Sequence, residues 1–185
     1  MIPYFQALPV AQAMPSFEKT PGEPKLTDLF SEEMEERMRA EGHLFSRRTS
    51  VPIAGARQVE AEETVETIVK EFKEDTRLAK VGDWVVTGST GEQFKNTDAE
   101  FHENYEQDES GQWLPKEKSV LVLPNPTGEP IAIIPPWANE ENPGPQRGDE
   151  HCFIVFVLSP QGDFTDNRYL IANEDILHTN YTEVV

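Results

Sequence analysis

The clearest periodic pattern of apolar residues lies near the N-terminus, in the stretch KLTDLFSEEMEERMRAEG. Apolar residues recur there at intervals of three and four, the spacing of one face of an α-helix: Leu26, Leu29, Phe30, Met34 and Met38. Charge pairs four residues apart support the helix, and the glycine that follows is a typical stop. The pattern predicts an amphipathic helix that packs on the body of its own protein, with docking on a partner as the alternative.

From residue 51 onward the pattern changes to short apolar blocks separated by proline and glycine, which is typical of β-strands. The segment TVETIV (64–69) fits a helix face, but five β-branched residues among six favour a strand. The segments DWVVTG (83–88) and STGEQF (89–94) predict two short strands around a turn that contains glycine.

A second β-rich block follows, with its strongest apolar runs in SVLVLP, EPIAIIPPW and HCFIVFVL. The last run is continuously apolar, which predicts a strand buried on both faces of a sheet. The intervening ANEENPGPQRG (138–148) is rich in proline, glycine and polar residues, which predicts a mobile loop. Frequent prolines in this half would keep its strands short, as small barrels require.

A repeated segment connects the two β-rich blocks. A shift of 76 residues places TDAEFHENYE (97–106) over NEDILHTNYTE (173–183), and aligns the motif His-x-Asn-Tyr in both. Each copy begins with a good N-cap residue, and the first copy also has Glu100 at the capping-box position. Each copy follows a predicted hairpin whose turn contains a glycine and an acidic residue. A duplicated module therefore explains the motif better than coincidence.

Together these patterns predict a mainly β protein of two related small barrel-like or rolled-sheet modules, preceded by an N-terminal amphipathic helix. The predicted boundaries are 1–48 for the lead-in and helix, 49–110 for the first module and 111–185 for the second.

The segment VGDWVVTGSTGEQFKNTDAEFHENYE also resembles a known pattern, Pro-Gly-Asp-Tyr/Trp-Ile-Val-Thr-Gly, then Gly-Glu-x-Tyr and Phe-x-x-x-Tyr-Glu. It is found in small uncharacterised modules of phage and bacterial hypothetical proteins. The matching residues are Gly82, Asp83, Trp84, Val85, Val86, Gly88, Gly91, Glu92, Phe94, Phe101, Tyr105 and Glu106. The chain departs from the pattern at Val81, where proline is usual. The resemblance implies a compact β-rich, phage-related module and supplies no catalytic residues.

The charge balance limits the choice of partners. Among 185 residues, 34 are acidic and 16 basic, which gives a formal net charge of −18. Such a charge opposes binding to nucleic acids and to anionic membranes. No apolar run reaches the roughly 18 residues that a membrane helix needs, and the N-terminus lacks the basic region of a secretory signal. We therefore expect a cytoplasmic protein, in which the single cysteine, Cys152, is a small core residue.

Motifs that would identify an enzyme or a metal site are missing from the sequence. The four histidines show no metal-binding spacing, and neither a phosphate-binding loop nor a nucleophile elbow occurs. We therefore name no catalytic residue and no cofactor. Convergence of His102 and His178 from the two copies of the repeat could still form a metal site, and two exposed histidines on equivalent turns are the alternative.

The segment DAEFHENYEQDE (98–109) is the most acidic part of the repeat. It contains no basic residue and offers six candidate binding residues: Asp98, Glu100, Glu103, Glu106, Asp108 and Glu109. A basic protein could read these carboxylates as phosphates, or the segment could be a solvated face around two core aromatics. The sequence thus favours a non-enzymatic binding or accessory module that acts through protein contacts. The alternative is an enzyme, or a binder of a small ligand or metal, with its site at the junction of the two modules.

Overall fold

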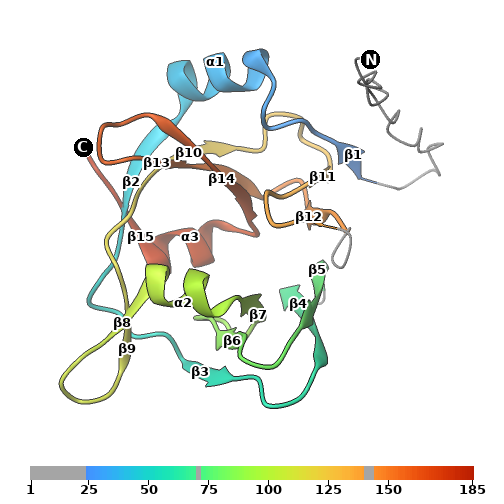
Figure 1. Ribbon diagram of the computed structural model, residues 1–185. Coiled ribbons are helices and arrows are strands. Elements are labelled where there is room, and N and C mark those ends of the chain that lie inside the picture. Colours follow the sequence, from blue (N-terminus) through green and yellow to red (C-terminus); the bar gives the residue numbers. More distant parts are fainter. Residues whose placement is uncertain (1–23, 70–71, 140–143) are drawn as a thin grey trace, which may run out of the picture.

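The computed structural model describes residues 24–69, 72–139 and 144–185, and its fold is mainly β, as predicted (Figure 1). The described strands form several small open sheets and no closed barrel. The elements in chain order are β1 (Lys25–Leu26), α1 (Glu32–Glu41), β2 (His43–Arg47), β3 (Gly55–Gln58), β4 (Glu63–Val69), β5 (Phe72–Ala79), β6 (Trp84–Thr87), β7 (Gln93–Asn96), α2 (Asp98–Asn104), β8 (Tyr105–Gln107), β9 (Trp113–Pro115), β10 (Ser119–Pro124), β11 (Ile131–Ile133), β12 (Gln146–Gly148), β13 (Phe153–Leu158), β14 (Phe164–Ile171), α3 (Glu174–Asn180) and β15 (Tyr181–Glu183).

The largest sheet has the order β14-β13-β10-β2-β15, with every neighbouring pair antiparallel. Its strand β13 is buried on both faces, which confirms the prediction from its continuous apolar run. Val155 and Val157 pack in one core with Tyr181, whereas Ile154 and Phe156 pack in a second core. Helix α1 covers the second core. In the structure we use the name second module for this sheet together with β1, α1, β11, β12 and α3, so that it includes segments from residues 25–47 besides the range 111–185 that the sequence predicted. It lies in the upper half of Figure 1.

Helix α1 is shorter than the apolar pattern predicted. It begins after Ser31, whose hydroxyl accepts a hydrogen bond from the Met34 amide at 3.3 Å. Leu26 instead lies in β1, which pairs in parallel with β11. The helix ends before Gly42, as predicted, and the reason is close approach: a Cβ there would collide with the Met38 carbonyl and side chain.

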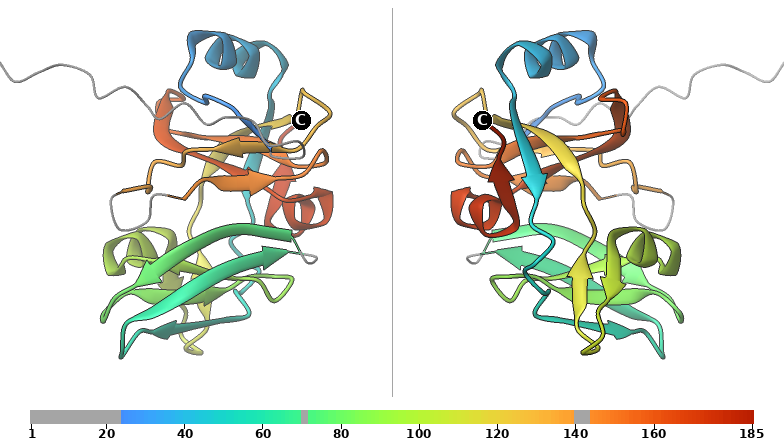
Figure 2. Two further views of the ribbon diagram at one scale, coloured as in Figure 1. Left: turned by 90° about the vertical axis from the view of Figure 1, so that its right-hand side faces the viewer. Right: turned by 90° about the vertical axis from the view of Figure 1, so that its left-hand side faces the viewer.

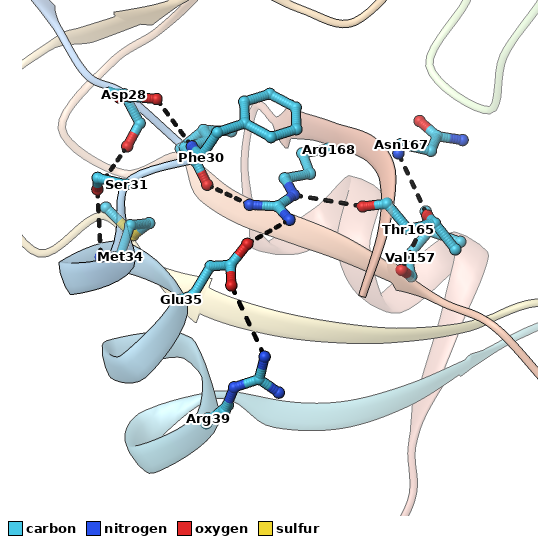
Figure 3. A network of polar contacts seen from close by, with 11 residues as sticks. Asp28, Phe30, Ser31, Met34, Glu35, Arg39, Val157, Thr165, Asn167 and Arg168 are labelled. Atoms are coloured by element: carbon cyan, nitrogen blue, oxygen red, sulfur yellow. Dashed lines mark hydrogen bonds and ion pairs between the residues drawn. The ribbon is translucent and has the colours of Figure 1, made fainter. Parts of the chain in front are cut away.

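A buried arginine on β14 fixes α1 to the sheet (Figure 3). The Arg168 guanidinium donates to the Leu29 carbonyl at 2.6 Å and to Thr165 O at 3.3 Å. It also forms an ion pair with Glu35 at 2.6 Å. Its side chain is only 5% exposed, so these oxygens replace the water that the charge has lost.

The strands β3 to β9 and helix α2 form the first module, in the lower half of Figure 1. Strand β4 confirms the strand predicted for residues 64–69. Strands β6 and β7 form the predicted hairpin, in which Gly91 has a φ of 87° that favours glycine. Trp84 stacks on the buried Phe101 of α2 with ring centroids 4.0 Å apart, so the hairpin and the helix share one core.

The prediction of a loop over residues 138–148 is wrong for its last three residues. Gln146–Gly148 forms β12, which pairs antiparallel with β11. The buried Gln146 side chain also donates to the Leu170 carbonyl at 3.1 Å and accepts from the Leu170 amide at 2.9 Å. These partners come from distant strands, so local composition did not reveal them. Residues 140–143 of the predicted loop lie outside the described residues.

The two copies of the repeat have equivalent geometry. Helices α2 and α3 have seven residues each and follow the N-cap residues Thr97 and Asn173, whose side chains accept from the third helical amide. The predicted capping box at Thr97 is present. Each helix is followed by a tyrosine in extended backbone, with φ of −134° at Tyr105 and at Tyr181.

The equivalence extends to a third strand, but that strand comes from different places in the chain. In the first copy β8 pairs with β9, and the Lys116 amide donates to Asn104 O at 2.8 Å. In the second copy β15 pairs with β2, and the Arg48 amide donates to Asn180 O at 2.8 Å. Strand β2, near the start of the chain, therefore takes the place in the second copy that β9 has in the first.

Candidate functional site

A cleft of about 560 Å³ lies between the two modules. This volume is within the range of roughly 300 to 1,000 Å³ that small-molecule sites occupy. The last residue of each helix and the tyrosine after it line the cleft, so Asn104 and Tyr105 face it from the first module, and Asn180 and Tyr181 from the second. The repeat therefore brings equivalent residues of its two copies to one place.

Three tyrosines line the cleft. Tyr105 and Tyr181 are 4% and 7% exposed, and the hydroxyl of Tyr181 lies 2.7 Å from that of Tyr169 on β14. Burial raises the pKa of Tyr105, and burial together with Tyr181 raises the pKa of Tyr169 well above its usual value. The phenols of Tyr105 and Tyr169 therefore keep their protons at physiological pH.

Two cations, Arg47 and Lys118, lie beside the tyrosines. The Arg47 guanidinium carbon is 5.0 Å from the centre of the Tyr105 ring, and Arg47 Nη1 donates to Asn104 O at 3.3 Å. The Lys118 ammonium donates to Asn104 Oδ1 at 2.6 Å. Burial and then repulsion by Arg47 lower the pKa of Lys118 to about 8. Within the described part of the chain, neither cation has a carboxylate within 4 Å.

A second set of polar residues lines the part of the cleft formed by β5 and β7. Arg77 is 9% exposed, donates from Nη1 to Lys95 O at 2.9 Å and lies 5.5 Å from the centre of the Trp137 ring. Burial lowers its pKa, and burial raises the pKa of the neighbouring Asp75. The Nε of Arg77 and the Oδ1 of Asn96 are buried without a hydrogen-bond partner among the described residues.

This unpaired oxygen leads to a first testable prediction. Replacing Asn96 with alanine, the residue at the equivalent position 172, should change the free energy of unfolding by no more than about 0.5 kcal/mol, because no bond to Oδ1 is lost. Asn180→Ala is the comparison: it removes a bond to Ile176 O at 2.9 Å and should cost about 1 kcal/mol. Urea unfolding of both variants measures the difference. Equal losses would show that Oδ1 is bonded in solution.

The two histidines of the repeat are not brought together. Helices α2 and α3 lie on opposite sides of the molecule (Figure 2), and His102 and His178 do not line the cleft. Each is about half exposed and lies 3.5 Å from a carboxylate of its own helix, Asp98 or Glu174. Among the described residues, no three His, Cys, Asp or Glu side chains form a metal-binding group.

The six acidic candidates divide into two sets. Asp98 accepts from Trp84 Nε1 at 2.8 Å, Glu100 completes the capping box, and Asp108 accepts from the amides of its own turn, so these three have structural roles. The hydrogen bond from Ser110 lowers the pKa of Asp108. The remaining three, Glu103, Glu106 and Glu109, are exposed.

Sequence reasoning missed the cations of the cleft, because Arg47, Arg77 and Lys118 belong to no motif. The repeated Asn-Tyr pair was a signal for this place, since it lines the cleft from both copies. Comparison of the chain with protein families, with curated proteins and with solved structures gives no match. In the described residues, no helix is long and apolar enough to cross a membrane. Function is therefore argued from the geometry of this cleft.

Proposed function

We propose that this protein binds a small ligand in the cleft between its two modules. The observation that carries the proposal is the lining of the cleft: equivalent Asn-Tyr pairs from both copies of the repeat meet there beside Arg47 and Lys118. Ligand sites of this size commonly combine aromatic walls with a few polar groups that fix orientation. A position between two modules is also a common place for such sites.

A titration followed by ¹H–¹⁵N NMR tests this proposal, with a mixed set of acidic, basic and neutral fragments as probes. The indole of Trp137 lines the cleft, whereas those of Trp84 and Trp113 pack around α2 outside it. We expect fragments that bind to shift the Trp137 indole signal and to leave the other two unchanged.

Matched tryptophan substitutions show whether binding occurs in the cleft. Ser89 lines the cleft and is exposed in the β6–β7 turn, so Ser89→Trp should block binding. Gln161 is exposed in the corresponding turn of the second module and does not line the cleft, so Gln161→Trp should leave binding intact. The proposal fails if no fragment shifts Trp137, or if Ser89→Trp binds as well as the unchanged protein.

A second function is supported by the charge of the surface. The net charge of −18 and the exposed Glu103, Glu106 and Glu109 favour an accessory module that docks on a basic protein. Changing these three glutamates to glutamine together should abolish capture of a basic partner from a lysate while the melting temperature stays unchanged. Retained capture would remove this candidate.

A further inference from the structure

We propose that the cleft recognises an oxyanion, a carboxylate or a phosphate group, through Arg47 and Lys118. This inference rests on the proposed ligand-binding function of the cleft and names the chemistry of the ligand. Anion binding is unexpected for a chain with a formal net charge of −18. The contacts of the two cations with the anion must therefore outweigh the repulsion from the net charge.

The first argument is the missing counter-charge. The other buried cations have acidic partners: Lys95 lies 3.2 Å from Asp83, and Arg168 lies 2.6 Å from Glu35. Arg77, although it has no ion pair within 4 Å, lies in the field of nearby acidic residues. In contrast, the groups that act on the pKa of Arg47 are tyrosines. Lys118 lies beside Arg47 and Asn104, and the acidic residue that acts on its pKa, Glu103, lies beyond ion-pair distance in the cleft wall. Two partly buried like charges repel, and an anion between them would relieve that repulsion.

The second argument is the supply of hydrogen-bond donors. A guanidinium has five N–H groups and an ammonium has three. Arg47 donates to Asn104 O and bonds to the Tyr105 hydroxyl, and Lys118 donates to Asn104 Oδ1, so further donors of both groups remain for a ligand. Tyr105 and the hydrogen-bonded pair Tyr169 and Tyr181 line the same cleft. Charge-assisted bonds from a guanidinium and an ammonium, with a phenol beside them, match the oxygens of a carboxylate or phosphate.

The third argument comes from the comparison of the two copies. Strands β2 and β9 occupy equivalent places, because Arg47 pairs with Tyr181 as Pro115 pairs with Tyr105. The first copy thus folds with proline where the second has arginine. The fold of the module does not itself require a cation at this position, and ligand binding explains why one is there.

The size of the cleft indicates that the anion is part of a larger molecule. A water molecule accounts for about 30 Å³ of liquid volume, so a cleft of about 560 Å³ exceeds the needs of an inorganic ion. Arg77 and Asn96 line another part of the same cleft, so the rest of such a ligand would lie against them.

The pH dependence of binding follows from Lys118. Arg47 and Glu103 are the charged groups that act on its pKa, the first lowering it and the second raising it, and Glu92 acts on the adjacent Tyr105. A bound anion favours the ammonium form, so binding couples to a protonated Lys118. For acetate, whose own charge does not change in this range, affinity should be nearly constant just below pH 8, where the ammonium predominates, and should fall as the pH rises above about 8.

The test uses sodium phosphate and sodium acetate as probes at constant ionic strength, with binding followed by NMR signals of Arg47 and Trp137. Binding of either probe tests whether the cleft recognises an oxyanion. The probe that binds more tightly shows whether the ligand carries a phosphate or a carboxylate group. Arg47→Met and Lys118→Met should each weaken binding by about tenfold or more. Arg48→Met and Lys116→Met are the controls, because they remove the same charge from neighbouring residues whose side chains bond to the carbonyls of His178 and His102 outside the cleft.

Unchanged affinity in Arg48→Met and Lys116→Met, together with the loss above pH 8 in the unchanged protein, is the expected result. Equal weakening of anion binding in all four variants would show that binding depends only on the total positive charge, and this result would overturn the inference. If neutral fragments enter the cleft while neither anion binds, the anion inference fails and the cleft remains a ligand site. If no fragment of any charge enters, the proposed function fails too. The pH series needs no variant, so a variant that does not fold leaves the test decisive.

Discussion

Replacement of Arg168 by methionine is expected to lower the free energy of unfolding by about 3 kcal/mol or more. The substitution keeps much of the apolar volume but removes the partner of Glu35 and the donors to Leu29 O and Thr165 O. Loss of one member of a buried ion pair costs more than loss of the whole pair, because the remaining polar groups stay desolvated. Urea unfolding followed by circular dichroism measures the loss.

Arg39→Met is the matched control for this prediction. Arg39 also pairs with Glu35, at 3.7 Å, but its side chain is 59% exposed. An exposed pair contributes about 0 to 1 kcal/mol, so the control should lose little stability. Equal losses in the two variants would contradict the view that the buried guanidinium holds α1 on the sheet.

The strands that could be predicted from the sequence are those whose signal is local. Strands β4 and β13 carry β-branched or continuous apolar residues, and the turn at Gly91 carries its own backbone signal. Strand β2, HLFSR, has no comparable pattern, because its partners β10 and β15 come from distant parts of the chain. The start of α1 was misplaced for a related reason: Leu26 is apolar because it pairs in β1, and periodicity alone could not separate strand from helix there.

The candidate site could be predicted only in part. The shift of 76 residues identified Asn104, Tyr105, Asn180 and Tyr181 as a repeated feature, and these residues meet in the cleft. Which side of each helix faces the cleft could not be read from the motif, since the histidine lies two residues before the asparagine and points elsewhere. The role of Arg47 depends on the exchange of β2 for β9, and that exchange is visible only in the paired strands.

Replacement of Tyr105 or Tyr181 by alanine should each lower the free energy of unfolding by about 3 kcal/mol or more. Both rings are nearly fully buried, Tyr105 with Phe101 and Tyr181 with the core of the large sheet. Such a loss is a large share of the roughly 5 to 15 kcal/mol that stabilises a typical domain. Tyr181→Phe removes only the bond to the Tyr169 hydroxyl and should cost about 1 kcal/mol.

His102→Ala and His178→Ala test the other half of the motif. Both side chains are half exposed and bond only to a carboxylate of their own helix, apart from edge contacts with aromatic rings. We therefore expect each change to cost about 1 kcal/mol or less and to leave fragment binding in the cleft intact. Thermal melts and the Trp137 NMR titration on the four alanine variants measure both effects.

If the histidine variants keep their melting temperature but no longer bind, the histidines belong to the functional site, and the distinction between a structural tyrosine and a peripheral histidine is wrong. If only the tyrosine variants lose stability, the repeated motif serves the architecture through its tyrosines, and the cleft between them is the place where the two copies act together.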